Sequence, residues 1–149
     1  MINLIPIIHH STIKMKNIDH IGIAVKDLKA SISLFESLLN TTCYKTETVT
    51  GENLVTAFLK TGETKIELLE DANKDGVINK FIEKKGEGIH HIAFEVADIR
   101  KEIIRLKAAG FIILNEEPRK GADNKWVCFL HPKSTNGTLI ELCQQIDAV

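Results

Sequence analysis

The stretch DHIGIAV, residues 19–25, has a counterpart 71 positions later in HHIAFEV, residues 90–96. Both stretches are rich in branched aliphatic residues that alternate with small or polar ones, a pattern typical of half-buried β-strands. Each carries a histidine at the equivalent position, His20 in the first and His91 in the second. Because self-similarity at a fixed spacing indicates copies of one structural unit, we interpret the whole chain from this pair.

Each stretch is followed by an aspartate that can cap a helix, Asp27 in the first copy and Asp98 in the second, again 71 positions apart. Apolar residues then recur at steps of three and four: Leu28, Ile32, Phe35 and Leu39 in the first copy, and Ile99, Ile103 and Leu106 in the second. This spacing predicts two amphipathic helices in equivalent places. Asn40 and Gly110, which tolerate a left-handed cap, mark their ends.

The same offset continues into the predicted strands that follow the helices. Phe58 corresponds to Phe129 with the spacing of 71, whereas Glu67 corresponds to Glu141 with a spacing of 74. The second hairpin loop, residues 131–137, is therefore three residues longer, and length differences between copies belong in turns. Each copy is predicted to form a strand, a helix and three further strands.

These elements predict an α+β fold with two repeated βαβββ modules, at about residues 17–71 and 88–145. A helical linker at about residues 76–86 joins the modules, and residues 1–15 are expected to be a flexible extension of the single domain, residues 16–149. The sheet of each module is apolar on one face, and two such sheets can bury these faces by packing together. We therefore expect one curved mixed sheet around a metal-binding cleft.

The overall charge excludes some classes of partner. The chain has 19 basic and 20 acidic side chains, so nothing indicates binding to nucleic acid or to a membrane surface. Its three cysteines lack a Cys-x-x-Cys pair and lie in apolar stretches, which favours reduced thiols and a cytoplasmic protein, or one of the mitochondrial matrix in a eukaryote. No apolar run reaches the roughly 18 residues of a membrane helix. Residues 1–8 lack the features of a secretory signal.

Four residues are candidate metal ligands: His20, Glu67, His91 and Glu141. Taken alone, each has an ordinary interpretation, because histidines at strand starts are often structural and a glutamate between aliphatic residues often faces solvent. Their recurrence at equivalent places in both modules favours a shared site, where two imidazoles and two carboxylates would meet. This set suits one divalent ion such as Co, Mn, Zn, Ni or Fe better than Ca or Mg.

Two further histidines have weaker signals. His90 precedes His91 and, by strict strand alternation, points to the opposite face of the sheet, so we predict a structural role. His131 precedes Pro132 in the long hairpin loop, where it either is solvated or forms part of the cleft rim.

The chain resembles the vicinal oxygen chelate superfamily, which includes lactoylglutathione lyases, ring-cleaving dioxygenases and bleomycin-binding proteins. Within it, the chain is most similar to methylmalonyl-CoA epimerases over about residues 17–145. Three motifs carry this resemblance: GEGIHHIAFEV at residues 86–96, HPKS with GTLIEL at residues 131–134 and 137–142, and EEP at residues 116–118 before a glycine-containing loop.

The resemblance implies a metal-dependent enzyme that interconverts (2R)- and (2S)-methylmalonyl-CoA through a metal-stabilised enolate. By analogy with the family, Glu141 is the candidate acid/base residue. In some relatives the strand before the Glu67 hairpin carries a glutamate proposed as one base, but here Thr56 stands at that position. Threonine cannot deprotonate such a carbon, so the second base stays unassigned.

The resemblance also implies a coenzyme A thioester as substrate and a homodimer as the assembly. Lys125, Lys133 and Ser134 are candidates for contacts with the substrate. Two other functions stay open: a lactoylglutathione lyase-type enzyme, and a non-catalytic protein of the same fold that binds a small molecule. The four ligand candidates argue against a ring-cleaving dioxygenase, whose iron site uses two histidines and one carboxylate.

Overall fold

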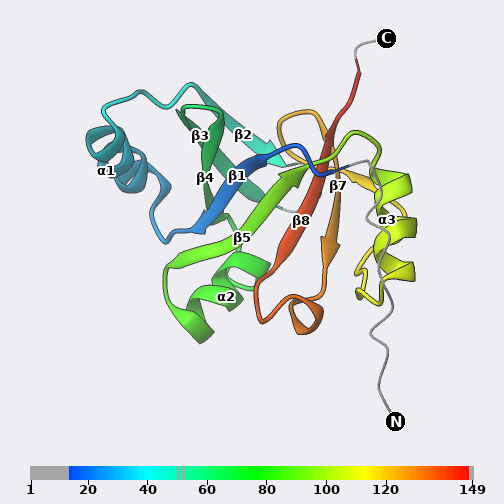
Figure 1. The fold of residues 1–149 in the computed structure, drawn as a ribbon. Helices are drawn as coiled ribbons and strands as arrows, with labels where there is room; N and C mark the ends of the chain where they lie inside the picture. Colours follow the sequence, from blue (N-terminus) through cyan, green and yellow to red (C-terminus); the bar gives the residue numbers. More distant parts are fainter. Residues whose placement is uncertain (1–13, 50, 52, 148–149) are drawn as a thin grey trace.

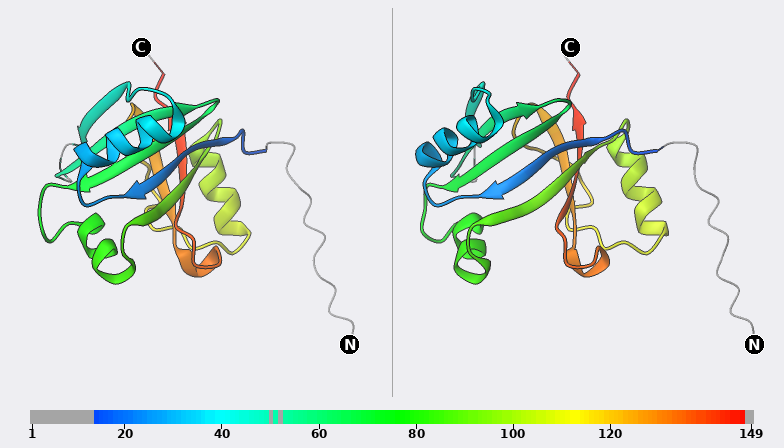
Figure 2. Two further views of the ribbon diagram at one scale, coloured as in Figure 1. Left: turned by 90° about the vertical axis from the view of Figure 1, so that its left-hand side faces the viewer. Right: turned by 60° about the vertical axis from the view of Figure 1, so that its left-hand side comes forward.

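The computed structural model describes residues 14–49, 51 and 53–147. The first half of the chain contributes β1 (Ile18–Ala24), α1 (Leu28–Leu39), β2 (Lys45–Val49), β3 (Leu54–Thr61) and β4 (Thr64–Asp71). The second half contributes α2 (Val77–Lys85), β5 (Gly88–Glu95), α3 (Ile99–Ala108), β6 (Arg119–Lys120), β7 (Lys125–Leu130), the short 3-10 helix η1 (Pro132–Ser134) and β8 (Ile140–Gln145). The strands form one curved sheet (Figure 1; Figure 2).

The strand order in the sheet is β2-β3-β4-β1-β5-β8-β7-β6. From the centre outward, each half of the sheet contains the first, fourth, third and second strands of its module. The first strands of the two modules, β1 and β5, pair antiparallel at the middle of the sheet, and each also pairs parallel with the last strand of its own module. This arrangement confirms the predicted α+β fold with a curved mixed sheet. The largest difference in length between equivalent elements is that of β6, which has two residues where its counterpart β2 has five.

The two repeat helices begin where the aspartates predicted. The side chain of Asp27 accepts a hydrogen bond from the amide of Ala30 at 2.9 Å, and Asp98 accepts one from Lys101 at 3.1 Å. Asn40 ends α1 in the left-handed conformation, as expected for a residue that tolerates positive φ. Satisfied amides at both starts fix where each helix leaves the sheet.

The apolar core lies between the helices and one face of the sheet. Leu28 of α1 packs with Leu59 and Leu68, and the corresponding cluster under α3 has the same make-up: Ile99, Ile103, Leu106, Cys128, Leu130 and Leu142. Because side chains alternate along a strand, the residues between these core positions point to the other face. The inner, concave face is therefore left free to build a site.

The remaining segments frame this inner face. Helix α2 packs against β4, β1 and β5 through its buried residues Ile78 and Ile82. Of the expected extension, residues 1–15, only Lys14 and Met15 are described, and the rest lies outside the described residues. Among the described helices, none has the length and apolar character needed to cross a membrane.

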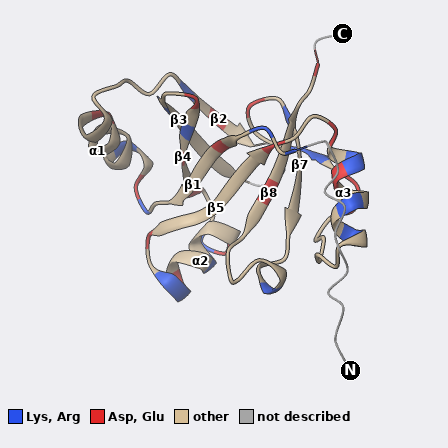
Figure 3. Ribbon diagram, viewed as in Figure 1, with Lys and Arg blue, Asp and Glu red and all other residues tan. Residues whose placement is uncertain are grey.

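Charged residues of both signs are distributed over the chain, with basic residues concentrated on α3 (Figure 3). The basic side chains of α3 are largely paired: Arg100 donates to Glu117 at 2.8 Å and Lys107 to Glu116 at 2.6 Å. These ion pairs join the outer side of α3 to the following loop. Exposed pairs of this kind stabilise the fold only slightly.

Candidate metal centre

The inner face of the sheet encloses a cavity of about 540 Å³. Both modules line it, and α2 contributes Val77 and Ile78 at one side. All four predicted ligands are among the lining residues: His20, Glu67, His91 and Glu141. Each is at least 94% buried, because the most exposed of them has 6% of its surface accessible. The structure therefore brings the four candidate residues together in one cavity.

The first row of the site crosses β4, β1 and β5. Gly22 of β1 pairs with Glu67 on one side and with His91 on the other. Paired residues share a face, so both functional side chains project into the cavity beside the glycine. A Cβ atom at Gly22 would overlap the His91 imidazole, which shows that the ring lies directly over this position.

The second row crosses β1, β5 and β8 and repeats the first. Ala93 of β5 pairs with His20 on β1 and with Glu141 on β8. Gly22 and Ala93 occupy equivalent positions in the two modules, 71 residues apart. Small residues at the centre of each row therefore leave room for the imidazoles, as the spacing of the repeat predicted.

Four side-chain atoms converge between the two rows. Nε2 of His20 lies 3.0 Å from Nε2 of His91, 3.2 Å from Oε2 of Glu67 and 3.8 Å from Oε2 of Glu141. Nε2 of His91 lies 3.4 Å and 3.2 Å from the same two carboxylate oxygens. Neutral imidazole nitrogens and carboxylate oxygens are all electron-pair donors, so the cluster has the character of a ligand set.

These separations fit a common centre. At a metal–ligand distance of about 2.1 Å, neighbouring ligands are separated by about 3.0 Å in an octahedron and about 3.4 Å in a tetrahedron. The five distances given above, each of which involves an imidazole nitrogen, are 3.0–3.8 Å and fall close to both values. His20, Glu67 and His91 form the compact group of donors, and the Glu141 carboxylate lies 3.2 Å from the His91 nitrogen. Two nitrogens and two oxygens suit a transition-metal ion or zinc.

The carboxylate of Glu67 is ionised within this cluster. Burial alone would raise its pKa, but hydrogen bonds from His20 and His91 lower the pKa to about 2. The same contacts act in reverse on His20: burial disfavours its charged form, whereas Asp19, Glu141 and Glu67 raise its pKa well above the usual value. The buried carboxylates therefore favour positive charge at this centre, which a divalent cation can supply in place of a proton on His20.

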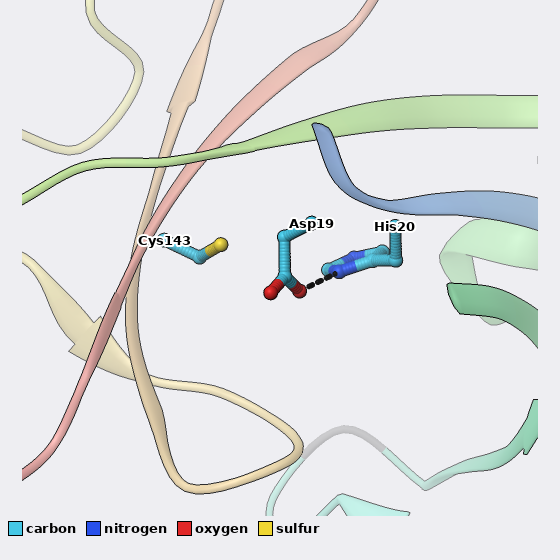
Figure 4. Close-up of side chains that lie close together, drawn as sticks. All are labelled: Asp19, His20 and Cys143. Carbon is cyan, nitrogen blue, oxygen red and sulfur yellow. Dashed lines mark hydrogen bonds and ion pairs between the residues drawn. The ribbon is translucent and has the colours of Figure 1, made fainter. Parts of the chain in front are cut away.

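Asp19 holds the other nitrogen of His20, a contact that the sequence pattern did not predict. Its Oδ2 lies 2.7 Å from Nδ1 of His20 (Figure 4). Ile18 and His20 pair with Phe94 and Ala93, so Asp19 is the extra residue of a β-bulge. A bulge suspends strict alternation, which lets the carboxylate reach its own neighbour's ring. A carboxylate at Nδ1 orients a histidine for metal binding through Nε2.

Cys143 lies on the far side of Asp19 from His20 (Figure 4). These three side chains could form a second group of metal donors, but their own bonds argue against it. The Cys143 thiol is fully buried and donates to the carbonyl of Phe94 at 3.6 Å. Burial raises the pKa of this thiol, which keeps it protonated. The cysteines are free, as predicted.

His90 is not on the opposite face, so this prediction was wrong. Gly22 pairs with His91 and Ile23 with Ile89, which makes His90 the extra residue of a second bulge, 71 positions after the first. Its side chain lines the cavity, and its Nδ1 lies 3.0 Å from Nδ1 of His91. Burial and the neighbouring His91 lower the pKa of His90 to about 4. His90 thus contacts Nδ1 of His91 in the same way that Asp19 contacts Nδ1 of His20.

Lys125 lines the cavity, where the sequence suggested a substrate contact, but its amine is already engaged. Its Nζ donates to Oδ1 of Asp19 at 2.7 Å, and both residues are buried. Lys65 also approaches Asp19, at 3.3 Å, and donates to Asp123 at 2.8 Å. Burial would raise the pKa of Asp19, but its hydrogen bonds with His20 and Lys125 and the nearby Lys65 hold that pKa well below its usual range.

Lys133 and Ser134 lie in η1 and are not among the residues that line the cavity. The hydroxyl of Ser134 donates to the carbonyl of His131 at 3.0 Å and accepts from the amide of Ile112 at 3.2 Å. Lys133 is exposed. Any contact that these two residues make with a substrate is therefore made outside the enclosed space.

Comparison with known proteins places this geometry in a family. The family model of the glyoxalase/bleomycin resistance protein/dioxygenase superfamily matches residues 19–129. An ethylmalonyl-CoA/methylmalonyl-CoA epimerase of Cereibacter sphaeroides is 40% identical over 129 residues, which cover 85% of this chain and 96% of the relative. The uncharacterized protein YqjC of Bacillus subtilis is 38% identical over 130 residues, 87% of this chain and 93% of its own.

A solved structure agrees with these relatives. A single-residue variant of Streptomyces coelicolor methylmalonyl-CoA epimerase, in complex with 2-nitronate-propionyl-CoA, superposes with a TM-score of 0.84. It is 33% identical, and the match covers 91% of this chain and 98% of that one. The chain therefore belongs to the glyoxalase/bleomycin resistance protein/dioxygenase superfamily and, within it, to the methylmalonyl-CoA epimerases, a family of enzymes.

Proposed function

We propose that this chain is a metal-dependent epimerase that interconverts (2R)- and (2S)-methylmalonyl-CoA. The observation that carries the proposal is the convergence of His20, Glu67, His91 and Glu141 inside one cavity. The two imidazole nitrogens lie 3.0 Å apart, and each lies 3.2–3.8 Å from both carboxylates. The family supplies the substrate class, since two of the proteins compared above are named as epimerases of such thioesters.

The reaction requires removal of a hydrogen from a carbon between a thioester and a carboxylate. A divalent ion held by the four ligands would supply positive charge beside the substrate oxygens, which stabilises the enolate as it develops. The four candidate ligands are buried, and electrostatic interactions between buried groups are stronger than those in water. Asp19 and His90 keep the two imidazoles aimed at the centre through their Nδ1 atoms.

Inversion requires that a proton leave one face of the carbon and return to the other. We propose Glu141 as one acid/base group, because its carboxylate lines the cavity at the centre of the site. A threonine hydroxyl is too weak a base for the second role, so Thr56 does not fill it. The second proton transfer therefore uses another group that lines the cavity, or water.

The size of the cavity limits which part of the thioester it encloses. Pockets of about 300–1,000 Å³ hold a drug-sized ligand, and coenzyme A is larger than that. A cavity of about 540 Å³ therefore suits the acyl group and the adjoining thioester arm. We propose that the nucleotide end lies outside, where Lys133 and Ser134 are placed to contact it. A homodimer and a cytoplasmic location stay predictions, and light scattering on a sizing column tests the first.

The experiment starts from (2R)-methylmalonyl-CoA alone and follows the appearance of the 2S form by circular dichroism. The proposal predicts conversion to an equal mixture by protein loaded with Co, Mn or Zn. The His91→Ala variant should bind little metal and convert no substrate. Conversion of a lactoyl–glutathione adduct in place of this thioester would assign the chain to the lyase reaction instead.

A further inference from the structure

One buried polar group in the cavity wall has no partner. Thr56 of β3 is fully buried, and its hydroxyl makes no hydrogen bond to any described residue. Threonine hydroxyls buried in this way are normally paired, because an unmade hydrogen bond costs free energy. An unpaired hydroxyl in a native wall therefore requires an explanation other than folding.

The repeat provides an internal comparison for this position. Val127 of β7 lies 71 residues after Thr56, with the same spacing that relates Phe58 to Phe129. Both Thr56 and Val127 line the cavity. Valine has nearly the shape of threonine but lacks the hydroxyl, so the fold accepts an apolar side chain at this place. The hydroxyl of Thr56 contributes nothing that packing of the module requires.

The neighbours of Thr56 explain why no protein group satisfies it. Leu54 and Phe58 flank it on the same face of β3, and its pairing residues are Leu69 on β4 and Glu47 on β2. The Glu47 carboxylate accepts a hydrogen bond from the amide of Asp123 at 2.9 Å and lies 3.1 Å from Nζ of Lys45, so it is engaged elsewhere. Leu54, Phe58 and Leu69 are apolar and also line the cavity, so the hydroxyl lies among apolar side chains and has no partner among the described residues. The hydroxyl is itself buried, so a polar group of a ligand reaches it by displacing these apolar side chains.

We propose that Thr56 is a substrate-binding residue whose hydroxyl donates a hydrogen bond to the carboxylate of a malonyl-type acyl group. The inference rests on the proposed function and adds a contact that selects for the carboxylate. An ionised acceptor forms the stronger hydrogen bond, and an anion placed against an apolar wall needs a donor there. Acyl groups with hydrogen in place of the carboxylate leave the hydroxyl unpaired and gain nothing from it.

The test compares two ligands and two substitutions on metal-loaded protein. Isothermal titration measures the dissociation constants of malonyl-CoA, which carries the carboxylate, and propionyl-CoA, which lacks it. Thr56→Val should weaken malonyl-CoA binding about tenfold, or about 1.4 kcal/mol, and leave propionyl-CoA binding within twofold. Thr56→Ser should keep most of the malonyl-CoA affinity, because it keeps the donor.

Stability separates this role from a structural one. Urea unfolding should find Thr56→Val at least as stable as the wild type, because the substitution removes an unpaired hydroxyl. Thr64→Val is the matched control: the Thr64 hydroxyl donates to the carbonyl of Ile18 at 3.2 Å, so its loss should lower stability and leave both affinities unchanged.

Other outcomes overturn the inference. Equal weakening for both ligands assigns the hydrogen bond to the thioester arm and refutes the carboxylate contact, and unchanged malonyl-CoA affinity refutes any contact. A loss of stability in Thr56→Val without change in affinity makes the residue structural. Failure of the wild type to bind either thioester would contradict the proposed function itself, a result that no Thr56 variant can mimic.

Discussion

The substitution Gly22→Ala should damage the metal centre without touching a ligand. The added Cβ would lie 2.8 Å from Nε2 of His91 and nearer to two other atoms of the ring. Ordinary contact begins at about 3.4 Å, so Nε2 must move by at least about 0.6 Å. Metal–ligand distances tolerate changes of only about 0.2 Å. The imidazole therefore leaves its ligand position.

The expected cost follows from that displacement. Changes to groups that merely support a ligand lower metal affinity about 10–100-fold, so displacing His91 itself should lower the affinity at least about 100-fold. Overpacking should also cost about 1–3 kcal/mol of stability in the metal-free protein. The assay is competition for zinc or cobalt with a chromophoric chelator, together with urea unfolding in the presence of a strong chelator.

A double-mutant cycle shows whether the effect passes through His91. In a His91→Ala background the ring is absent, so Gly22→Ala should change the free energy of unfolding by less than about 0.5 kcal/mol. Wild-type metal affinity in Gly22→Ala would refute the reasoning, as would equal destabilisation in both backgrounds.

Three other perturbations give separate outcomes. Asp19→Asn removes the carboxylate that orients His20, so a competition titration should find metal binding about 10–100-fold weaker. The substitution also leaves buried Lys125 without this partner, so urea unfolding should find that the free energy of unfolding falls by about 3 kcal/mol. Burial alone would raise the pKa of Asp123, but Lys65 beside it lowers that pKa below its value in the unfolded chain. The ionised carboxylate therefore stabilises the fold at a pH above the unfolded-state pKa, and this stabilisation is lost as the pH falls through the folded-state pKa. Asp123→Asn should therefore cost about 1 kcal/mol at pH 7, and the difference from wild type should shrink as pH falls towards 3. Metal at 100 times its dissociation constant should stabilise the protein by about 2.7 kcal/mol, so a chelator should lower the melting temperature by roughly 5–10 °C in a calorimeter.

The repeat made the fold predictable, and with it the meeting of the four candidate ligands in one cavity. One offset of 71 residues places His20 and His91, and the change to 74 places Glu67 and Glu141 once the longer loop is assigned to a turn. A pseudo-twofold sheet then brings equivalent residues to the same centre, as the pairing of β1 with β5 does here. This inference needed only strand periodicity and symmetry.

The two bulges were not predictable from the same periodicity. Asp19 and His90 are each the extra residue of a bulge, and strict alternation places both on the wrong face. Nothing in the local composition marks where a strand will bulge. Their equivalent positions, directly before each ligand histidine, were the one available signal, and a carboxylate before His20 could have been assigned to its Nδ1 on that ground.

The assembled structure also decides which charged residues pair and whether a buried hydroxyl finds a hydrogen-bond partner. Lys125 is 106 residues from Asp19 in sequence, and only sheet order brings them within 2.7 Å. The unpaired hydroxyl of Thr56 is a property of its surroundings, because the same residue in another wall would find an acceptor. Sequence patterns locate ligands that recur, whereas single long-range contacts appear only with the fold.

The most direct test of the account is exchange of the α-hydrogen of methylmalonyl-CoA in deuterated water, followed by proton NMR. The protein is first stripped with a chelator and then resupplied with Co, Mn or Zn. If the chain is a metal-dependent epimerase, exchange is rapid, requires the metal and is lost in His91→Ala. Exchange at the same rate in stripped protein, or none in protein shown to hold the metal, would contradict it.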